Sequence, residues 1–285
     1  MYILKIIDAH LHFTNSEGLK QTAENIGKLD YSVEGLHKEL IQSNVVAGVV
    51  MSTPRRKILE SQYSAESIII EDKKIDNLFS CVGVNPDELV NSNKELDFVE
   101  EELKKNSVIG IKLYPGYYHF YVHDSIYDPI YALAIKYNVP VAIHCGATQS
   151  ATGLLKYSHP LTVDELAVKY PDIKFIICHM GVPWFMDAAQ MIMKNDNVYT
   201  DLSGLIAGDK AEIEKVKNTR LYTELIQQGL VYANRYDKIL YGSDWPLVQM
   251  EPYIDFIKYL IPEEHHENVF YNNAKKVFSK IKSGD

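Results

Sequence analysis

Residues 6–13 read IIDAHLHF, and the two histidines in this otherwise apolar run need an explanation. In a β-strand successive side chains point to opposite faces, so Asp8, His10 and His12 share one face. A buried polar group without a partner costs roughly 1 to 3 kcal/mol, so buried imidazoles need partners. The pattern fits a metal ion at the end of a buried strand, and a hydrogen-bonded polar cluster is the alternative.

Short apolar runs of the same kind recur along the chain, separated by amphipathic segments. The runs span residues 2–8, 45–51, 78–84, 108–114, 139–144, 173–179, 197–203 and 238–243. Most are continuous rather than alternating, which is typical of parallel strands covered on both faces. The amphipathic segments include residues 32–44, 93–106, 125–138, 161–170 and 211–236. Strands that alternate with helices predict βαβ units.

The number of these units decides the expected fold. Eight βα units followed by a final helix over 263–281 predict an α/β protein, a closed (β/α)8 TIM barrel with a C-terminal helix. We expect one domain over residues 1–285, because no linker or composition shift interrupts the pattern. No G-x-G-x-x-G motif follows the first strand, which disfavours an open dinucleotide-binding sheet.

Composition excludes several classes of function. The 29 Lys and Arg against 38 Asp and Glu give a net charge of -9 without a basic run, which argues against nucleic-acid binding. No apolar run approaches the roughly 18 residues of a membrane span. No signal peptide is recognisable, so we expect a cytoplasmic location. Cys81, Cys145 and Cys178 lack C-x-x-C spacing and are expected to be free thiols, with catalysis by Cys145 as the alternative.

The candidate site lies at the C-terminal ends of the strands, where TIM barrels carry their active sites. The residues expected at these ends are His10, His12, Lys112, Tyr114, His144, His179, Ser243 and Asp244. Three or four imidazoles with one carboxylate suit one divalent transition metal, Zn²⁺ first, with Mn²⁺, Fe²⁺ or Co²⁺ as alternatives. A metal-activated water needs a nearby proton acceptor, and Asp244 is placed for that role.

Seven motifs extend this pattern over nearly the whole chain. They are DAHLHF (8–13), GIKLYP (110–115), VAIHCG (141–146), FIICHMG (175–181), NVYTDLSG (197–204), ILYGSDWP (239–246) and NNAKKVF (272–278). With these motifs in this order, the chain resembles the amidohydrolase superfamily. Within it, the chain is most similar to the amidohydrolase-related branch of metal-dependent TIM-barrel hydrolases and decarboxylases.

The resemblance assigns roles to the strand-end residues. It implies a metal held by His10, His12 and His144, with Asp244 as fourth ligand and proton acceptor. His179 would be catalytic through a hydrogen bond to the water or to the developing oxyanion, or would bind a second metal. We expect one metal ion. Two-metal members of the superfamily use a bridging carboxylated lysine or glutamate, for which Lys112 is the candidate here.

The loops after the strands are expected to bind a small-molecule substrate. Candidate contacts are Lys112, Tyr114, Arg55 or its neighbour Arg56, and Trp245. We expect hydrolysis of a small ester, lactone, amide or carboxylate-bearing substrate. A non-oxidative decarboxylase of a small unsaturated or aromatic acid is the first alternative; a metal-free lactonase and a binding protein are further ones. Barrels of this kind often form homodimers, but no interface is evident in the sequence.

Overall fold

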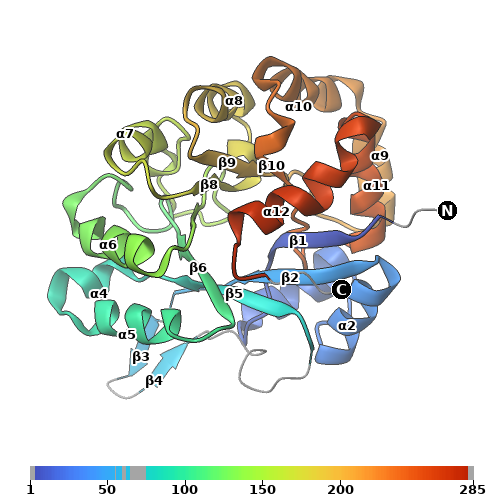
Figure 1. Cartoon of the computed structure of the whole chain (residues 1–285). Helices are drawn as coiled ribbons and strands as arrows, with labels where there is room; N and C mark the ends of the chain where they lie inside the picture. The colour runs from blue at the N-terminus through green and yellow to red at the C-terminus, as the bar shows by residue number, and fades with distance from the viewer. Residues whose placement is uncertain (1–3, 55, 60–61, 65–74, 282–285) are drawn as a thin grey trace.

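The computed structural model describes residues 4–54, 56–59, 62–64 and 75–281. Eight parallel strands form one sheet in the order β1-β2-β5-β6-β7-β8-β9-β10 (Figure 1). Their bounds are β1 Ile6–Leu11, β2 Val45–Met51, β5 Leu78–Gly83, β6 Val108–Leu113, β7 Val141–Ile143, β8 Phe175–Ile177, β9 Val198–Asp201 and β10 Ile239–Leu240. Each strand lies beside its successor in the sheet, which confirms the predicted (β/α)8 TIM barrel.

The segment after β10 is attached to the end of β1. The His12 amide donates to the Trp245 carbonyl at 2.6 Å, and the Asp244 amide donates to the His10 carbonyl at 2.8 Å. These bonds bring the last strand back to the first. They also place Asp244 beside the two histidines that open the chain.

Helices surround the strands (Figure 1). They are α1 Glu17–Thr22, α2 Val33–Gln42, α4 Pro86–Asn91, α5 Lys94–Leu103, α6 Asp128–Tyr137, α7 Thr162–Lys169, α8 Phe185–Lys194, α9 Lys210–Lys217, α10 Arg220–Ala233, α11 Met250–Leu260 and α12 Asn273–Val277. The predicted helix over 211–236 is two helices, α9 and α10. Asn218 and Thr219 donate their side chains to carbonyls of the last turn of α9, which competes with continuation of the helix.

A short antiparallel ribbon, β3 (Arg56–Leu59) with β4 (Gln62–Ser64), is added between β2 and β5. The periodicity of the sequence did not predict it. The expected final helix over 263–281 is also shorter: a 3-10 turn and a π-helical turn precede α12.

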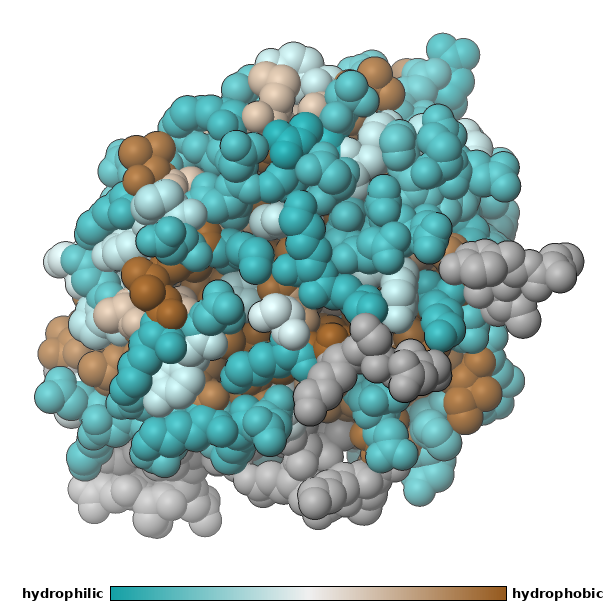
Figure 2. All heavy atoms as spheres, viewed as in Figure 1, coloured by the Kyte–Doolittle hydropathy of each residue, from teal (hydrophilic) through white to brown (hydrophobic). Residues whose placement is uncertain are grey.

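The C-terminal segment closes the end of the barrel opposite the candidate site. Val277 and Phe278 join one buried cluster with strand residues such as Ile7 and Ile109. A larger apolar cluster fills the layer between strands and helices. The face seen in Figure 2 is mostly hydrophilic, with apolar residues in separate spots. Among the described residues, no helix combines the length and apolarity needed to cross a bilayer.

Helix α2 begins directly after a serine that caps its first turn. Ser32 has an extended backbone, and its Oγ accepts a hydrogen bond from the Gly35 amide at 3.0 Å. This bond satisfies one of the amides that the first turn of a helix leaves without a partner.

Replacement of Ser32 by Ala should therefore lower the free energy of unfolding by about 1 kcal/mol. Ser16, which precedes α1 without a side-chain capping bond, provides the control. Ser16→Ala should change the free energy of unfolding by less than about 0.5 kcal/mol. Urea denaturation followed by circular dichroism measures both, and equal losses would contradict the capping role.

Candidate metal centre

The two histidines at the end of β1 are held in the same tautomer. His10 Nδ1 lies 2.9 Å from Asp201 Oδ2, and His12 Nδ1 lies 2.8 Å from the Met51 carbonyl oxygen. Both oxygens only accept hydrogen bonds, so each Nδ1 carries the proton and each Nε2 keeps a lone pair. Those Nε2 atoms lie 3.4 Å and 3.2 Å from the same oxygen, Asp244 Oδ1. Three potential ligand atoms thus meet at one point.

The histidines after β7 and β8, His144 and His179, also have one ring nitrogen bonded to a main-chain carbonyl. His179 uses Nδ1 for this bond, as His10 and His12 do for theirs, whereas His144 uses Nε2. His144 Nε2 lies 3.1 Å from the Ala147 carbonyl oxygen, and His179 Nδ1 lies 3.2 Å from the Ser203 carbonyl oxygen. The remaining nitrogens, His144 Nδ1 and His179 Nε2, face each other at 3.2 Å. With both protons donated to carbonyls, two lone pairs face the same space, an arrangement that a cation relieves.

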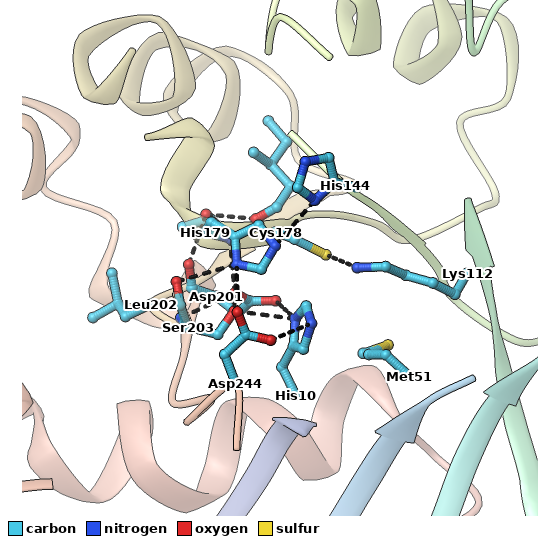
Figure 3. A network of polar contacts seen from close by, with 12 residues as sticks. His10, Met51, Lys112, His144, Cys178, His179, Asp201, Leu202, Ser203 and Asp244 are labelled. Carbon is cyan, nitrogen blue, oxygen red and sulfur yellow. Dashed lines mark hydrogen bonds and ion pairs between the residues drawn. The ribbon is translucent and has the colours of Figure 1, made fainter. Parts of the chain in front are cut away.

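Two orphaned atoms test whether these residues fit a metal ion. Among the described residues, His10 Nε2 and Asp244 Oδ1 are buried side-chain atoms without a hydrogen-bond partner. Ligand atoms of His10, His179 and Asp244 all lie within 4.8 Å of one another (Figure 3). Buried polar atoms normally have partners, so their convergence fits a divalent transition metal.

The charge states of the side chains agree with this fit. Burial, together with the nearby Lys112 charge, lowers the pKa of His10 to about 3. Burial also lowers the pKa of His144 and of His179, so these imidazoles are neutral, the form that binds metals. Burial opposes ionisation of Asp244, but the imidazoles of His179 and His10 outweigh it and hold its pKa below the usual range.

Backbone conformation at the site is unusual. His179 and Asp244 have φ angles of 61° and 59°, a region that residues with side chains rarely occupy. Gly204 has φ 63°, and a Cβ there would lie 2.7 Å from His179 Nδ1 and 2.8 Å from Asp244 Oδ2. Such strained positions cluster at functional sites, where the surrounding structure enforces them.

The cluster forms the floor of a cavity of about 590 Å³. Its floor includes His12, Lys112, Tyr114, His144, His179 and Asp244. Its walls include Asn15, Glu17, Tyr117, Gln149 and Leu247. A cavity of this size with convergent polar groups at its base is typical of a site for a small molecule.

Two predicted substrate contacts line this cavity. Lys112 is fully buried, and its Nζ lies 2.9 Å from Cys178 Sγ. The Tyr114 hydroxyl donates to the Ser52 carbonyl oxygen at 3.1 Å. Lys112 therefore brings a positive charge to the base of the cavity, and Tyr114 supplies part of its wall.

Trp245, a third predicted contact, is not brought to the cavity. Trp245 is fully buried and stacks on Tyr31 with ring centroids 5.2 Å apart, outside the residues that line the cavity. The prediction for Trp245 was wrong, because the indole fills the core behind the β1–β10 junction. Arg55 lies outside the described residues, and for Arg56 only its place at the start of β3 is described.

The three cysteines and Asp8 lie close to these histidines or in the core around them. Cys81, Cys145 and Cys178 are buried and free, as predicted. Burial raises the pKa of the Cys145 thiol, which is typical of a structural cysteine. Asp8 Oδ1 accepts from the His10 and Ser243 amides, so it supports the segment that carries the ligands.

Asp201 and Ser203 were missed by the analysis of the sequence. Both are fully buried, and both contact His10 and His179. Their signal was the stretch NVYTDLSG, in which a carboxylate ends an apolar strand just as Asp8 does in the first one.

The sequence model of the amidohydrolase family matches residues 7–280. The chain belongs to the amidohydrolase family. A 93-residue stretch is 30% identical to Protein fluG of Emericella nidulans, over 30% of this amidohydrolase and 11% of fluG. This match therefore spans only about a tenth of that relative.

Solved structures of similar fold accompany this family match. An uncharacterised TIM-barrel protein, Bb4693 from Bordetella bronchiseptica, has a TM-score of 0.72 at 17% identity over 98% of this chain and 99% of its own. A probable 2-pyrone-4,6-dicarboxylic acid hydrolase from Acinetobacter baumannii has a TM-score of 0.64 at 16% identity, over 96% of this chain and 99% of its own. A dihydroxybenzoic acid decarboxylase from Polaromonas with bound manganese has a TM-score of 0.62 at 13% identity, over 99% of this chain and 98% of its own. Similar barrels thus serve both hydrolysis and decarboxylation.

Removal of one orphaned ligand should abolish metal binding. His10→Ala deletes Nε2 and leaves Asp244 Oδ1 without one of its neighbours. We therefore expect the variant to contain less than about a tenth of the metal found in the unmodified protein. Mass spectrometry of protein purified without chelator measures this content. His37→Ala, on the exposed face of α2, is the control and should keep the metal. Full metal content in His10→Ala would refute the assignment.

Proposed function

We propose that this amidohydrolase is a metal-dependent hydrolase of a small ester, lactone, amide or carboxylate-bearing substrate. The observation that carries the proposal is the cluster at the base of a cavity, in which His10, His12 and His179 lie beside an ionised Asp244 and His144 faces His179. The four histidines each have one ring nitrogen bonded to the protein, which leaves the other for the centre. This arrangement supports activation of a water molecule.

One divalent metal would be held by His10, His12, His144 and Asp244. It would supply a water of lowered pKa and would polarise the substrate carbonyl. Zinc is our first choice because imidazole and carboxylate ligands suit it. Manganese is the alternative, supported by the manganese bound in the similar Polaromonas decarboxylase.

Asp244 and His179 are the proposed catalytic residues. With Oδ1 directed at the metal, the ionised Asp244 keeps Oδ2 as the oxygen that can accept a proton from water. Its Oδ2 lies 3.8 Å from His179 Nδ1, so both act on the same small volume. His179 presents the lone pair of Nε2 to the floor of the cavity, where it can accept a hydrogen bond from the water that attacks the substrate.

Lys112 is the proposed anchor for a negative charge on the substrate. It is the cationic side chain among the described residues that line the cavity. Its ammonium group is buried 2.9 Å from a thiol and 5.1 Å from the centre of the Tyr114 ring. Because little solvent screens this positive charge, it stabilises a nearby substrate carboxylate or developing oxyanion more strongly than a surface charge would.

Decarboxylation is a second candidate because the same cation can hold a substrate carboxylate at the metal. The resemblance of the fold to the Polaromonas decarboxylase adds weight to it. The two reactions differ in their products, since hydrolysis consumes water and releases an acid, whereas decarboxylation releases carbon dioxide. An assay that records both pH and carbon dioxide over lactones, esters, amides and aromatic acids distinguishes them.

Asp244→Asn should reduce turnover by at least about 100-fold with the substrate found in that assay, because the amide does not accept the proton of water. Asp255→Asn on α11, which is outside the cavity, is the control and should retain activity. Steady-state kinetics with metal in excess make the measurement. Turnover of Asp244→Asn at the unmodified rate would exclude Asp244 as the proton acceptor.

A further inference from the structure

Asp201 lies at the centre of the hydrogen bonds around the candidate metal centre (Figure 3). Its Oδ2 accepts from His10 Nδ1 at 2.9 Å. Its Oδ1 accepts from the amides of His179 and Ser203 at 2.9 Å and 3.1 Å, and from the Ser203 hydroxyl at 2.5 Å. The two oxygens of one carboxylate therefore serve different histidines.

Ser203 continues this network to the ring of His179. Because the Ser203 hydroxyl proton is donated to Asp201, the Oγ lone pairs are left to accept. His179 Nδ1 lies 2.8 Å from this Oγ and 3.2 Å from the Ser203 carbonyl oxygen. Both acceptors fix the proton on His179 Nδ1, so Nε2 faces the cavity as a lone pair. His10 Nδ1 is farther from the same Oγ, at 3.1 Å, and closer to Asp201 Oδ2, at 2.9 Å, so Asp201 remains its main acceptor.

We propose that Asp201 and Ser203 are positioning residues with separable effects. Asp201 Oδ2 fixes the His10 tautomer and so controls metal affinity. Ser203 fixes the His179 ring and so controls turnover at a fixed metal content. The Asp201 part depends only on the metal centre, whereas the Ser203 part rests on the catalytic role proposed for His179.

The isosteric change Asp201→Asn tests the first part sharply. Oδ1 faces three donors, so the amide oxygen keeps that position and the amide nitrogen replaces Oδ2 opposite His10 Nδ1. A donor there forces His10 to accept at Nδ1 and to carry its proton on Nε2. The nitrogen needed by the metal is then blocked, while the contacts to His179 and Ser203 remain.

Metal affinity measures this effect without any substrate. We expect Asp201→Asn to bind Zn²⁺ about 10- to 100-fold more weakly than the unmodified protein in competition with a chromogenic chelator. Nitrogen-15 NMR of the metal-free proteins should show the His10 proton moving from Nδ1 to Nε2. Unchanged affinity with an unchanged tautomer would overturn the role of Asp201.

Ser203→Ala tests the second part. It should bind Zn²⁺ as tightly as the unmodified protein, whereas kcat falls about 10- to 100-fold with KM within about 2-fold. Thr200→Val is the matched control, since it removes a buried hydroxyl from the same segment that bonds only to the Ile177 and Asp201 carbonyls. Thermal unfolding of each metal-free variant verifies that the protein is folded.

The outcomes separate the inference from the proposed function. Weaker metal binding in Ser203→Ala, equal to that of Asp201→Asn, would overturn the separation of roles. An unchanged kcat in Ser203→Ala would overturn the role of Ser203. If no substrate is turned over at all, the proposed function fails, while the affinity and tautomer of Asp201→Asn still decide the first part.

Discussion

The site depends on the hydrogen bonds that join the segment after β10 to the end of β1. The Asp244 amide bonds to the His10 carbonyl, and the His12 amide bonds to the Trp245 carbonyl. Two stretches near opposite ends of the chain are thereby held side by side. Their contact closes a loop that contains most of the sequence. Without this junction Asp244 would not face the two imidazoles, and the other histidines would lack the carboxylate on which they converge.

The imidazoles of the candidate metal centre are oriented by protein oxygens that lie on the far side of each ring from the centre. A carboxylate holds one, and main-chain carbonyls hold the other three. Each of these oxygens accepts a hydrogen bond from one ring N–H and so leaves the lone pair of the other ring nitrogen directed at the centre. Burial keeps the rings of His10, His144 and His179 neutral, so a metal ion meets lone pairs and not protons.

The strand ends could be predicted from the sequence because barrel topology sends them all to one rim. His10, His144 and Asp244 each follow an apolar run, and order along the chain fixes their strands. Partners such as Asp201 could not be predicted in the same way, because its contact with His10 spans 191 positions and depends on ring orientation. The orientation of Trp245 escaped prediction for the same reason: its neighbours decide whether an indole fills the core or lines a cavity.

The floor of the cavity alone does not distinguish hydrolysis from decarboxylation. Both reactions gain from neutral imidazoles, a metal ion and the cation of Lys112, since both stabilise negative charge on a substrate oxygen. They differ in the proton: hydrolysis needs an acceptor for the proton of water, whereas decarboxylation needs a donor to the carbon that loses its carboxylate. Asp244 lies 3.2 Å from His12 Nε2 at this centre, and it is the carboxylate placed to transfer either proton. The choice between the two reactions therefore depends on what the walls of the cavity hold against the metal centre, since the walls decide whether a water or the substrate carbon lies beside Asp244.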